Sequence, residues 1–140
     1  MHLGTVDIYA VSLAAAASLV LGYAWYSDFL FKRYWLKSMG RTPAQFTRDR
    51  KKMDGGVEFI LSLLTSVVMA AILAHLMDLT DTNTVIGGLY MGLFIWMGFV
   101  VVVLGSLVLH ERRHLDYFAI TAGHRLIELM VMGAIIGAIA

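Results

Sequence analysis

Two long runs without a charged residue constrain this chain more than any other feature of its sequence. Residues 8–27 and residues 82–109 form runs of 20 and 28 residues that contain no Asp, Glu, Lys or Arg. About 20 predominantly apolar residues span a bilayer as a helix. The whole chain is 59% hydrophobic, whereas a soluble domain is about 45–50% apolar. We therefore expect an integral membrane protein, which excludes nucleic-acid binders as a class.

Hydropathy predicts an all-α bundle of four transmembrane helices in a single domain, residues 1–140. The helices are expected at about residues 6–27, 57–77, 85–109 and 116–140. No Lys or Arg precedes the first run, and that run is longer than the apolar core of a signal peptide, so we expect it to remain in the mature chain. The chain contains no cysteine, which excludes disulfides and thiol chemistry.

Lysine and arginine are concentrated in two of the three expected connections. Residues 29–56 hold eight of the eleven, the third connection adds Arg112 and Arg113, and the second connection has none. The positive-inside rule then places the first and third connections in the cytoplasm. Both termini are expected outside.

The first connection, residues 29–56, has the pattern of amphipathic helices on the inner membrane surface. Aromatic and aliphatic residues alternate with Lys and Arg over residues 29–37, which predicts an interfacial helix. A capping-box pattern at Thr42-Pro43-Ala44-Gln45 predicts a second short helix that ends near residues 54–56. We expect contact with membrane lipids, anionic ones included. The residues expected at the lipid interface are Trp25, Tyr26, Lys32, Arg33, Trp35 and Lys37.

The fourth span carries charged residues at a depth where charge is costly. Helical spacing places His124, Arg125 and Glu128 within about 100° of arc, with Glu128 roughly 12 Å below the inner boundary if the hydrocarbon begins near Ile120. A charge at mid-bilayer costs at least about 2.5–3.5 kcal/mol, so these residues should face the bundle interior. An intrahelical pair between Glu128 and Arg125 is expected.

Polar residues of the second span share one face at a comparable depth, and Asp28 closes the first span at the same level. We therefore expect a polar vestibule that opens toward the cytoplasm. Its candidate residues are Asp28, Glu58, Ser62, Thr65, Ser66, His124, Arg125 and Glu128.

A match to the zinc-protease motif H-E-x-x-H occurs at His110, Glu111 and His114. In that motif two histidines one helical turn apart hold the metal, and the glutamate activates water. The match lies at a helix end beside the two arginines, a third ligand is not evident, and four helices leave little room for a substrate cleft. We therefore expect no catalytic residue and no cofactor, and a zinc enzyme is the least favoured hypothesis.

Two glycine pairs with G-x-x-x-G spacing permit close contact between helices. They are Gly88 with Gly92 in the third span and Gly133 with Gly137 in the fourth. The same spacing serves contacts within a chain and contacts between copies, so a homo-oligomer formed through these faces is an open alternative.

Aromatic residues at the end of the first span carry a family resemblance. Gly22-Tyr23-Ala24-Trp25-Tyr26, the phenylalanines that follow and Trp35 are similar to the signature of small bacterial membrane proteins known as domain of unknown function 1761. Trp96-Met97-Gly98-Phe99 and Glu111-Arg112 resemble the second half of that family. The resemblance implies a four-helix membrane fold in a bacterial inner membrane, and it implies no activity.

The leading functional hypothesis is a small transport protein, or a protein that binds a small ligand or ion, with its site in the polar interior of spans two and four. The alternative is a structural or accessory subunit whose buried charges only specify packing. The two are distinguished by whether Glu128 and Arg125 face a hydrated cavity or a dry helix contact.

Overall fold

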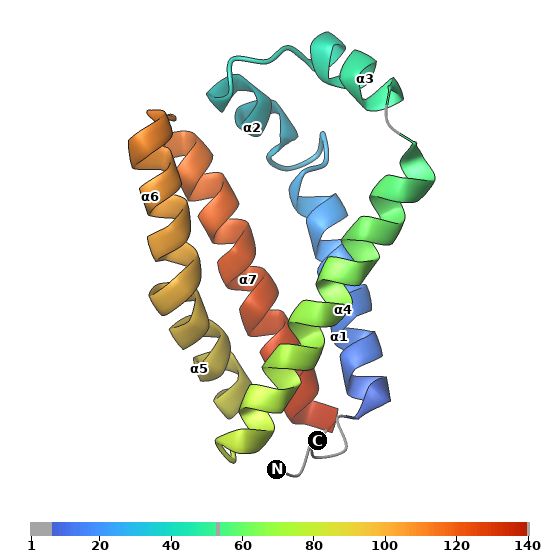
Figure 1. Cartoon of the computed structure of the whole chain (residues 1–140), viewed down its shortest axis with the longest axis vertical. Helices are drawn as coiled ribbons and strands as arrows, with labels where there is room; N and C mark the ends of the chain where they lie inside the picture. The colour runs from blue at the N-terminus through green and yellow to red at the C-terminus, as the bar shows by residue number, and fades with distance from the viewer. Residues whose placement is uncertain (1–6, 53, 140) are drawn as a thin grey trace.

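Residues 7–52 and 54–139, which this computed structural model describes, contain helices and no strand. Val6 and Ala140, with which the first and fourth predicted spans begin and end, lie outside the described residues. The order of the helices, shown in Figure 1, is α1 (Ile8–Trp25), α2 (Lys32–Ser38), α3 (Pro43–Lys51), α4 (Gly55–Leu79), α5 (Val85–Ile95), η1 (Trp96–Val100), α6 (Val101–Glu111) and α7 (Leu115–Ile139).

Four helical segments of the described chain are long and apolar enough to cross a membrane: α1, α4, the continuous α5–η1–α6 segment, and α7. Their bounds differ from the predicted ones by two residues or fewer. The second span begins at Gly55 instead of residue 57 because the Asp54 carboxylate accepts a hydrogen bond from the Gly56 N–H at 2.9 Å. An aspartate at the N-cap satisfies one of the free N–H groups of the first turn.

The helix α7 lies at the centre of the bundle and contacts each of the other three spans. Its closest contact is with α5, where the backbones touch. A Cβ atom built on Gly88 would lie 1.9 Å from the carbonyl oxygen of Gly133, and one on Gly137 would lie 2.0 Å from that of Thr84. Only glycine allows helices to approach so closely. Gly88, Gly92, Gly133 and Gly137 are all buried in this contact, which uses these faces within one chain.

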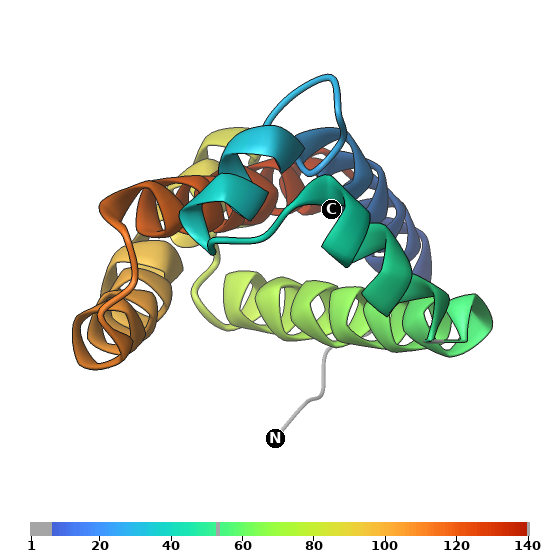
Figure 2. The same cartoon turned by 90° about the horizontal axis from the view of Figure 1, so that it is seen from above.

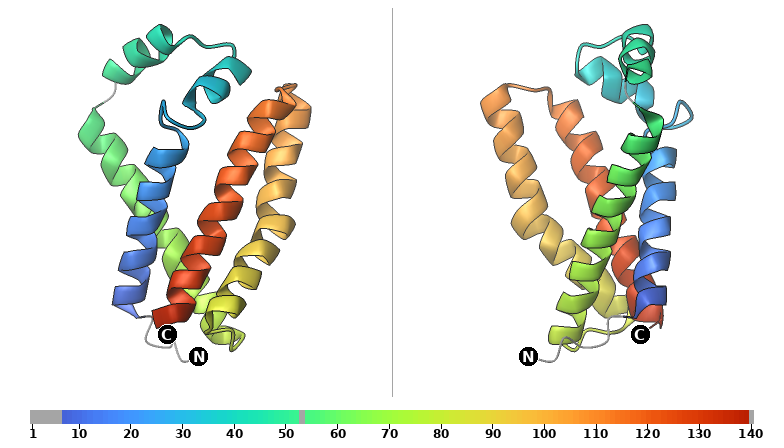
Figure 3. Two further views of the ribbon diagram at one scale, coloured as in Figure 1. Left: turned by 180° about the vertical axis from the view of Figure 1, so that it is seen from behind. Right: turned by 45° about the vertical axis from the view of Figure 1, so that its right-hand side comes forward.

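Small side chains of α1 allow it to pack against α4 and α7. Ala10, Ala14 and Ala15 are buried against Leu73 and Met77 of α4, and Met132 and Ile136 of α7 complete this apolar core. The four spans converge at the end where α1 begins and α7 ends, and they spread toward the opposite end (Figures 1 and 3). The apolar core fills the converging end.

The helices α2 and α3 lie across the spread end of the bundle, as Figure 2 shows. The predicted capping box is present: Gln45 N–H donates to Thr42 Oγ1 at 3.2 Å, and Thr42 N–H donates to Gln45 Oε1 at 3.0 Å. The helix that this box begins ends at Lys51, a few residues earlier than predicted. Leu36 of α2 is buried, which fixes this helix to the bundle.

A π-helical segment, η1, interrupts the third span at Trp96–Val100. The Trp96 indole N–H donates to the carbonyl oxygen of Ala122 in α7 at 2.7 Å. Segments of this kind are rare and occur often at functional sites. Hydropathy gave no indication of it, since a π-turn leaves the apolar character of a span unchanged.

Candidate functional site

A network of polar side chains joins α1, α4 and α7 at the level where the spans begin to spread apart. Glu128 of α7 is at its centre, with 4% of its side chain exposed. One carboxylate oxygen accepts a hydrogen bond from Arg125 Nη1 at 2.6 Å, which forms the predicted ion pair. The other accepts from the Ser18 hydroxyl of α1, whose oxygen lies 3.2 Å from the Ser66 hydroxyl of α4. The buried carboxylate therefore has partners on both oxygens.

Above this network lies a polar cavity of about 380 Å³ between α1, α4 and α7. The Arg125 side chain is 42% exposed and faces it, whereas Glu128 is buried beneath. Seven of the eight residues predicted for a polar vestibule line this cavity: Glu58, Ser62, Thr65 and Ser66 from α4, and His124, Arg125 and Glu128 from α7. The polar faces of α4 and α7, which helical periodicity predicts, therefore line the same cavity.

Asp28 is the predicted residue that does not line the cavity. The helix α1 ends at Trp25, so Asp28 lies in the turn beyond it, where 91% of its side chain is exposed. It pairs with Lys32 across 3.6 Å. The prediction failed because it extended the first span to residue 27.

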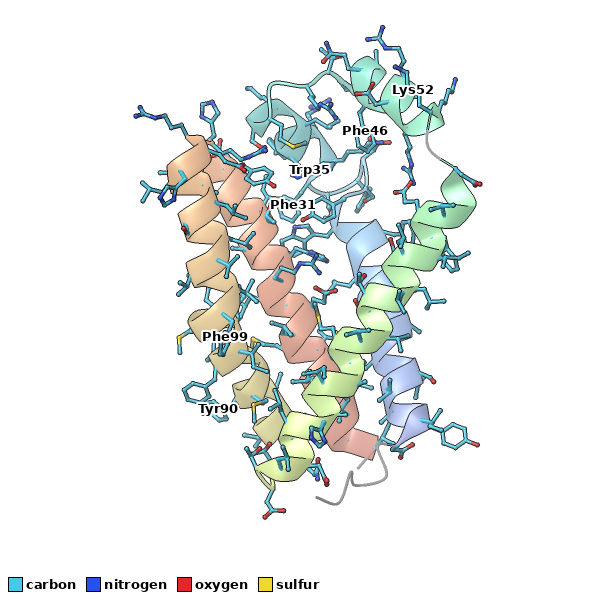
Figure 4. The ribbon with its side chains drawn as sticks, viewed as in Figure 1. Phe31, Trp35, Phe46, Lys52, Tyr90 and Phe99 are labelled. Atoms are coloured by element: carbon cyan, nitrogen blue, oxygen red, sulfur yellow. The ribbon has the colours of Figure 1, made fainter. Side chains whose placement is uncertain are left out.

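Aromatic side chains cover the cavity from the side of α2 and α3. The Tyr26 ring centroid lies 5.1 Å from that of His124 and 4.9 Å from that of Trp35. Trp35 in turn packs against Phe46 of α3, and Figure 4 shows these two rings between the surface helices and the bundle. The Trp25 indole N–H donates to the carbonyl oxygen of Ile120 at 3.0 Å.

Trp25, Tyr26 and Trp35, which the sequence predicts at the lipid interface, are half-buried and pack against other side chains at the spread end of the bundle. The chain reverses after α1, where the Phe31 N–H donates to the carbonyl oxygen of Trp25, and this turn folds α2 back onto the bundle. Of the predicted interfacial cations, Arg33 and Lys37 are exposed, and Lys32 lies 5.1 Å above the Phe46 ring.

His124 is buried beside the cavity with no hydrogen-bond partner. It is 5% exposed, and neither ring nitrogen bonds to any of the described residues. Thr121 Oγ1, one turn earlier on α7, also lacks a partner there. Buried polar groups in folded proteins nearly always have partners. A group from outside the chain, such as water or a ligand, would satisfy them.

The H-E-x-x-H residues do not form the geometry that the zinc motif requires. The helix α6 ends at Glu111, and Arg112 adopts a left-handed conformation with φ 53° and ψ 45°. His110 and His114 therefore do not share one face of a helix, and Glu111 pairs with Arg113 at 2.6 Å. Within residues 7–52 and 54–139, no three His, Asp or Glu side chains gather as a metal site.

The sequence matches the model of the family described as "Protein of unknown function (DUF1761)" over residues 9–137. The chain belongs to this family. The match includes every residue of the polar cavity and its network. No curated protein and no solved structure matches the chain.

The cavity of this DUF1761 protein includes residues that sequence reasoning missed. Ser18 is not among the residues predicted for the site, although small residues recur in the first span at the spacing of one helical face, at Ala14, Ala15, Ser18 and Gly22. Lys32 and Arg50 also line the cavity, and Arg50 Nε lies 3.7 Å from Glu58 Oε2. No periodicity could place these two, because they come from the connection between spans.

Proposed function

We propose that this protein crosses a bacterial inner membrane four times and binds a small ligand in the polar cavity between α1, α4 and α7. The connections that carry Lys and Arg would face the cytoplasm under the positive-inside rule, and the cavity lies at that end of the bundle. A ligand would therefore enter from the cytoplasmic side, past α2 and α3.

The observation that carries this proposal is the group of unused hydrogen-bonding atoms at the cavity. His124 is buried with both nitrogens unpartnered among the described residues. A guanidinium has five N–H groups, and the hydrogen bond from Arg125 to Glu128 uses one of them. An unsatisfied buried polar group costs about 1–3 kcal/mol. A ligand with an acceptor atom would bond the one N–H of a neutral imidazole and so remove part of that cost, which is a physical reason for binding.

Ligand binding, and not a complete transport path, is the activity that this geometry favours. The apolar core around Ala14, Leu73 and Met132 fills the bundle between the cavity and its other end. Passage across the membrane would require these helices to separate.

A structural or accessory role remains the second candidate, and one observation favours it. Both oxygens of Glu128 already have partners, and its network ties α1, α4 and α7 together. Such a network can specify packing without any ligand.

Cysteine accessibility tests the proposal in a chain that has no native cysteine. Ser62 lines the cavity, and its neighbour Leu63 does not and is partly exposed on the outside of the bundle. In inside-out membrane vesicles, we expect Ser62→Cys to react with a membrane-impermeant thiol reagent and Leu63→Cys to remain unmodified. Acetate, butyrate and inorganic phosphate are then tested for protection of Ser62→Cys.

Binding in the cavity predicts that at least one of these anions slows modification of Ser62→Cys, and that Arg125→Gln abolishes this protection. An unreactive Ser62→Cys would mean a dry helix contact and would favour the structural role. Reactivity without protection by any of them would leave a hydrated cavity that does not bind small anions.

A further inference from the structure

An apolar groove lies beside the polar cavity. It has a volume of about 610 Å³ and lies between α4 and the α5–η1 part of the third span. Leu64, Val68, Ile72 and Leu76 line it along α4, with Ile95 and Phe99 opposite; Figure 4 shows Phe99 on the third span. From Leu64 to Leu76 the groove follows α4 for about 18 Å, at 1.5 Å per residue.

The groove and the polar cavity adjoin each other. Thr65 lines both of them, and Leu129, in the wall of the groove, directly follows Glu128. A molecule that occupied both spaces would have a polar end among the side chains of Arg125 and His124 and an apolar end along α4.

We propose that the ligand of the polar cavity is a single-chain amphiphile with an anionic head, and this inference rests on the function proposed above. The head is a carboxylate or a phosphate that accepts hydrogen bonds from Arg125 and His124. The alkyl chain lies in the groove, which offers room for one extended chain beside α4.

The exposed guanidinium at the cavity favours an anionic head. The cations that line the cavity, Lys32, Arg50 and Arg125, each lie in an ion pair, but Arg125 alone pairs with a buried carboxylate while 42% of its own side chain is exposed. The hydrogen bond to Glu128 uses one N–H of the Arg125 guanidinium, and the rest of this side chain, which lines the cavity, has N–H groups available to an acceptor. Hydrogen bonds between a guanidinium and a carboxylate or phosphate are among the strongest in proteins.

The chain alone would not make the site selective. Lipid tails are as apolar as the leucine side chains of a helix, so an alkyl chain gains little on leaving the bilayer for the groove. Selectivity must therefore come from the head, and an uncharged amphiphile of equal length should bind poorly. This difference separates a ligand site from the ordinary lipid that covers any apolar helix face.

Photolabelling of the protein in phosphatidylcholine nanodiscs tests the proposal. The probe is palmitate that carries a diazirine at mid-chain, and labelled residues are mapped by mass spectrometry. We expect saturable labelling of groove residues on α4 and of Phe99. Unlabelled palmitate should compete about tenfold better than hexadecanol, because a hydrogen bond between a guanidinium and a carboxylate is stronger than one to a hydroxyl; tenfold in affinity is about 1.4 kcal/mol.

Three variants complete the test. Arg125→Gln, which removes the partner of the head, should abolish saturable labelling. Ile72→Trp, which fills the groove, should abolish it as well, whereas Ile60→Trp should keep it, because Ile60 is a similarly exposed residue of α4 outside the groove. Circular dichroism and gel filtration establish that each variant folds.

Labelling that spreads evenly over the outer face of α4, or that hexadecanol displaces as well as palmitate, would overturn the proposal. If butyrate protects Ser62→Cys in an Arg125-dependent way but saturable groove labelling is absent, the cavity binds small anions and the amphiphile is wrong. If butyrate gives no protection while the groove labels saturably only with Arg125 intact, the chain is required for binding and the proposal stands.

Discussion

Glu128 and Arg125 form an ion pair whose two members lie in different surroundings. The carboxylate is buried, with 4% of its side chain exposed, whereas 42% of the Arg125 side chain is exposed at the cavity. Removal of one partner from a buried pair leaves the other charge without compensation. The two single substitutions should therefore differ in cost, because only Arg125 can turn toward water.

We expect Arg125→Leu to destabilise the detergent-solubilised protein more than Glu128→Leu. The first strands a buried carboxylate and should approach the roughly 3–5 kcal/mol that breaking a buried pair costs. The second loses hydrogen bonds to a charged group, about 1.5–3 kcal/mol. Unfolding followed by circular dichroism measures both, and Arg125→Leu with Glu128→Leu should be more stable than Arg125→Leu alone. Equal losses in the two single variants would contradict the difference in burial.

At the scale of single residues, helical periodicity predicted most of the side chains that line the cavity, but not the positions that depend on turns of the chain. The polar faces of the second and fourth spans follow from helical spacing, and they line one cavity. The inward positions of Tyr26 and Trp35 depend on a reversal of the chain after Trp25, which no spacing rule contains. The sequence likewise contains the zinc motif H-E-x-x-H, but α6 ends before the left-handed Arg112, so the two histidines of the motif do not share one helical face.

The contact between α5 and α7 depends on the absence of side chains. Gly88→Ala would place a methyl group against the backbone of Gly133, at 1.9 Å from its carbonyl oxygen, so the two helices must move apart. Overpacking of this kind typically costs about 1–3 kcal/mol. We expect Gly88→Ala to lower the unfolding temperature clearly in a thermal scan of the purified protein.

Gly105→Ala is the matched control for Gly88→Ala, since it lies on the same span and its new methyl would meet Phe118 at an ordinary 3.7 Å. It should leave the unfolding temperature nearly unchanged. A loss of stability as large as that of Gly88→Ala would mean that glycine matters in this span for some reason other than close approach. The sequence predicted these glycines as packing residues and left open which helix they meet, because G-x-x-x-G spacing does not specify a partner.

For the whole molecule, the distribution of basic residues leads to a test of orientation. Thr47 of α3 and Thr80 at the end of α4 are both exposed and lie at opposite ends of the bundle. If the basic connections face the cytoplasm, Thr80→Cys should react with an impermeant thiol reagent in intact cells. Thr47→Cys should react only after the membrane is permeabilised. The opposite pattern would place the polar cavity on the outer side.

The central position of α7 has a consequence for the synthesis of the protein. Of the four spans it is the last to be made, yet it is the principal partner of α5 and the source of the only charged side chains in the network with Ser18 and Ser66 among the described residues. A nascent chain in which three spans are inserted can pack α1 against α4. The glycines of its third span, however, have no α7 to contact. The bundle can therefore close only after α7 has been synthesised and inserted, and the glycine face of the third span lacks its partner until then.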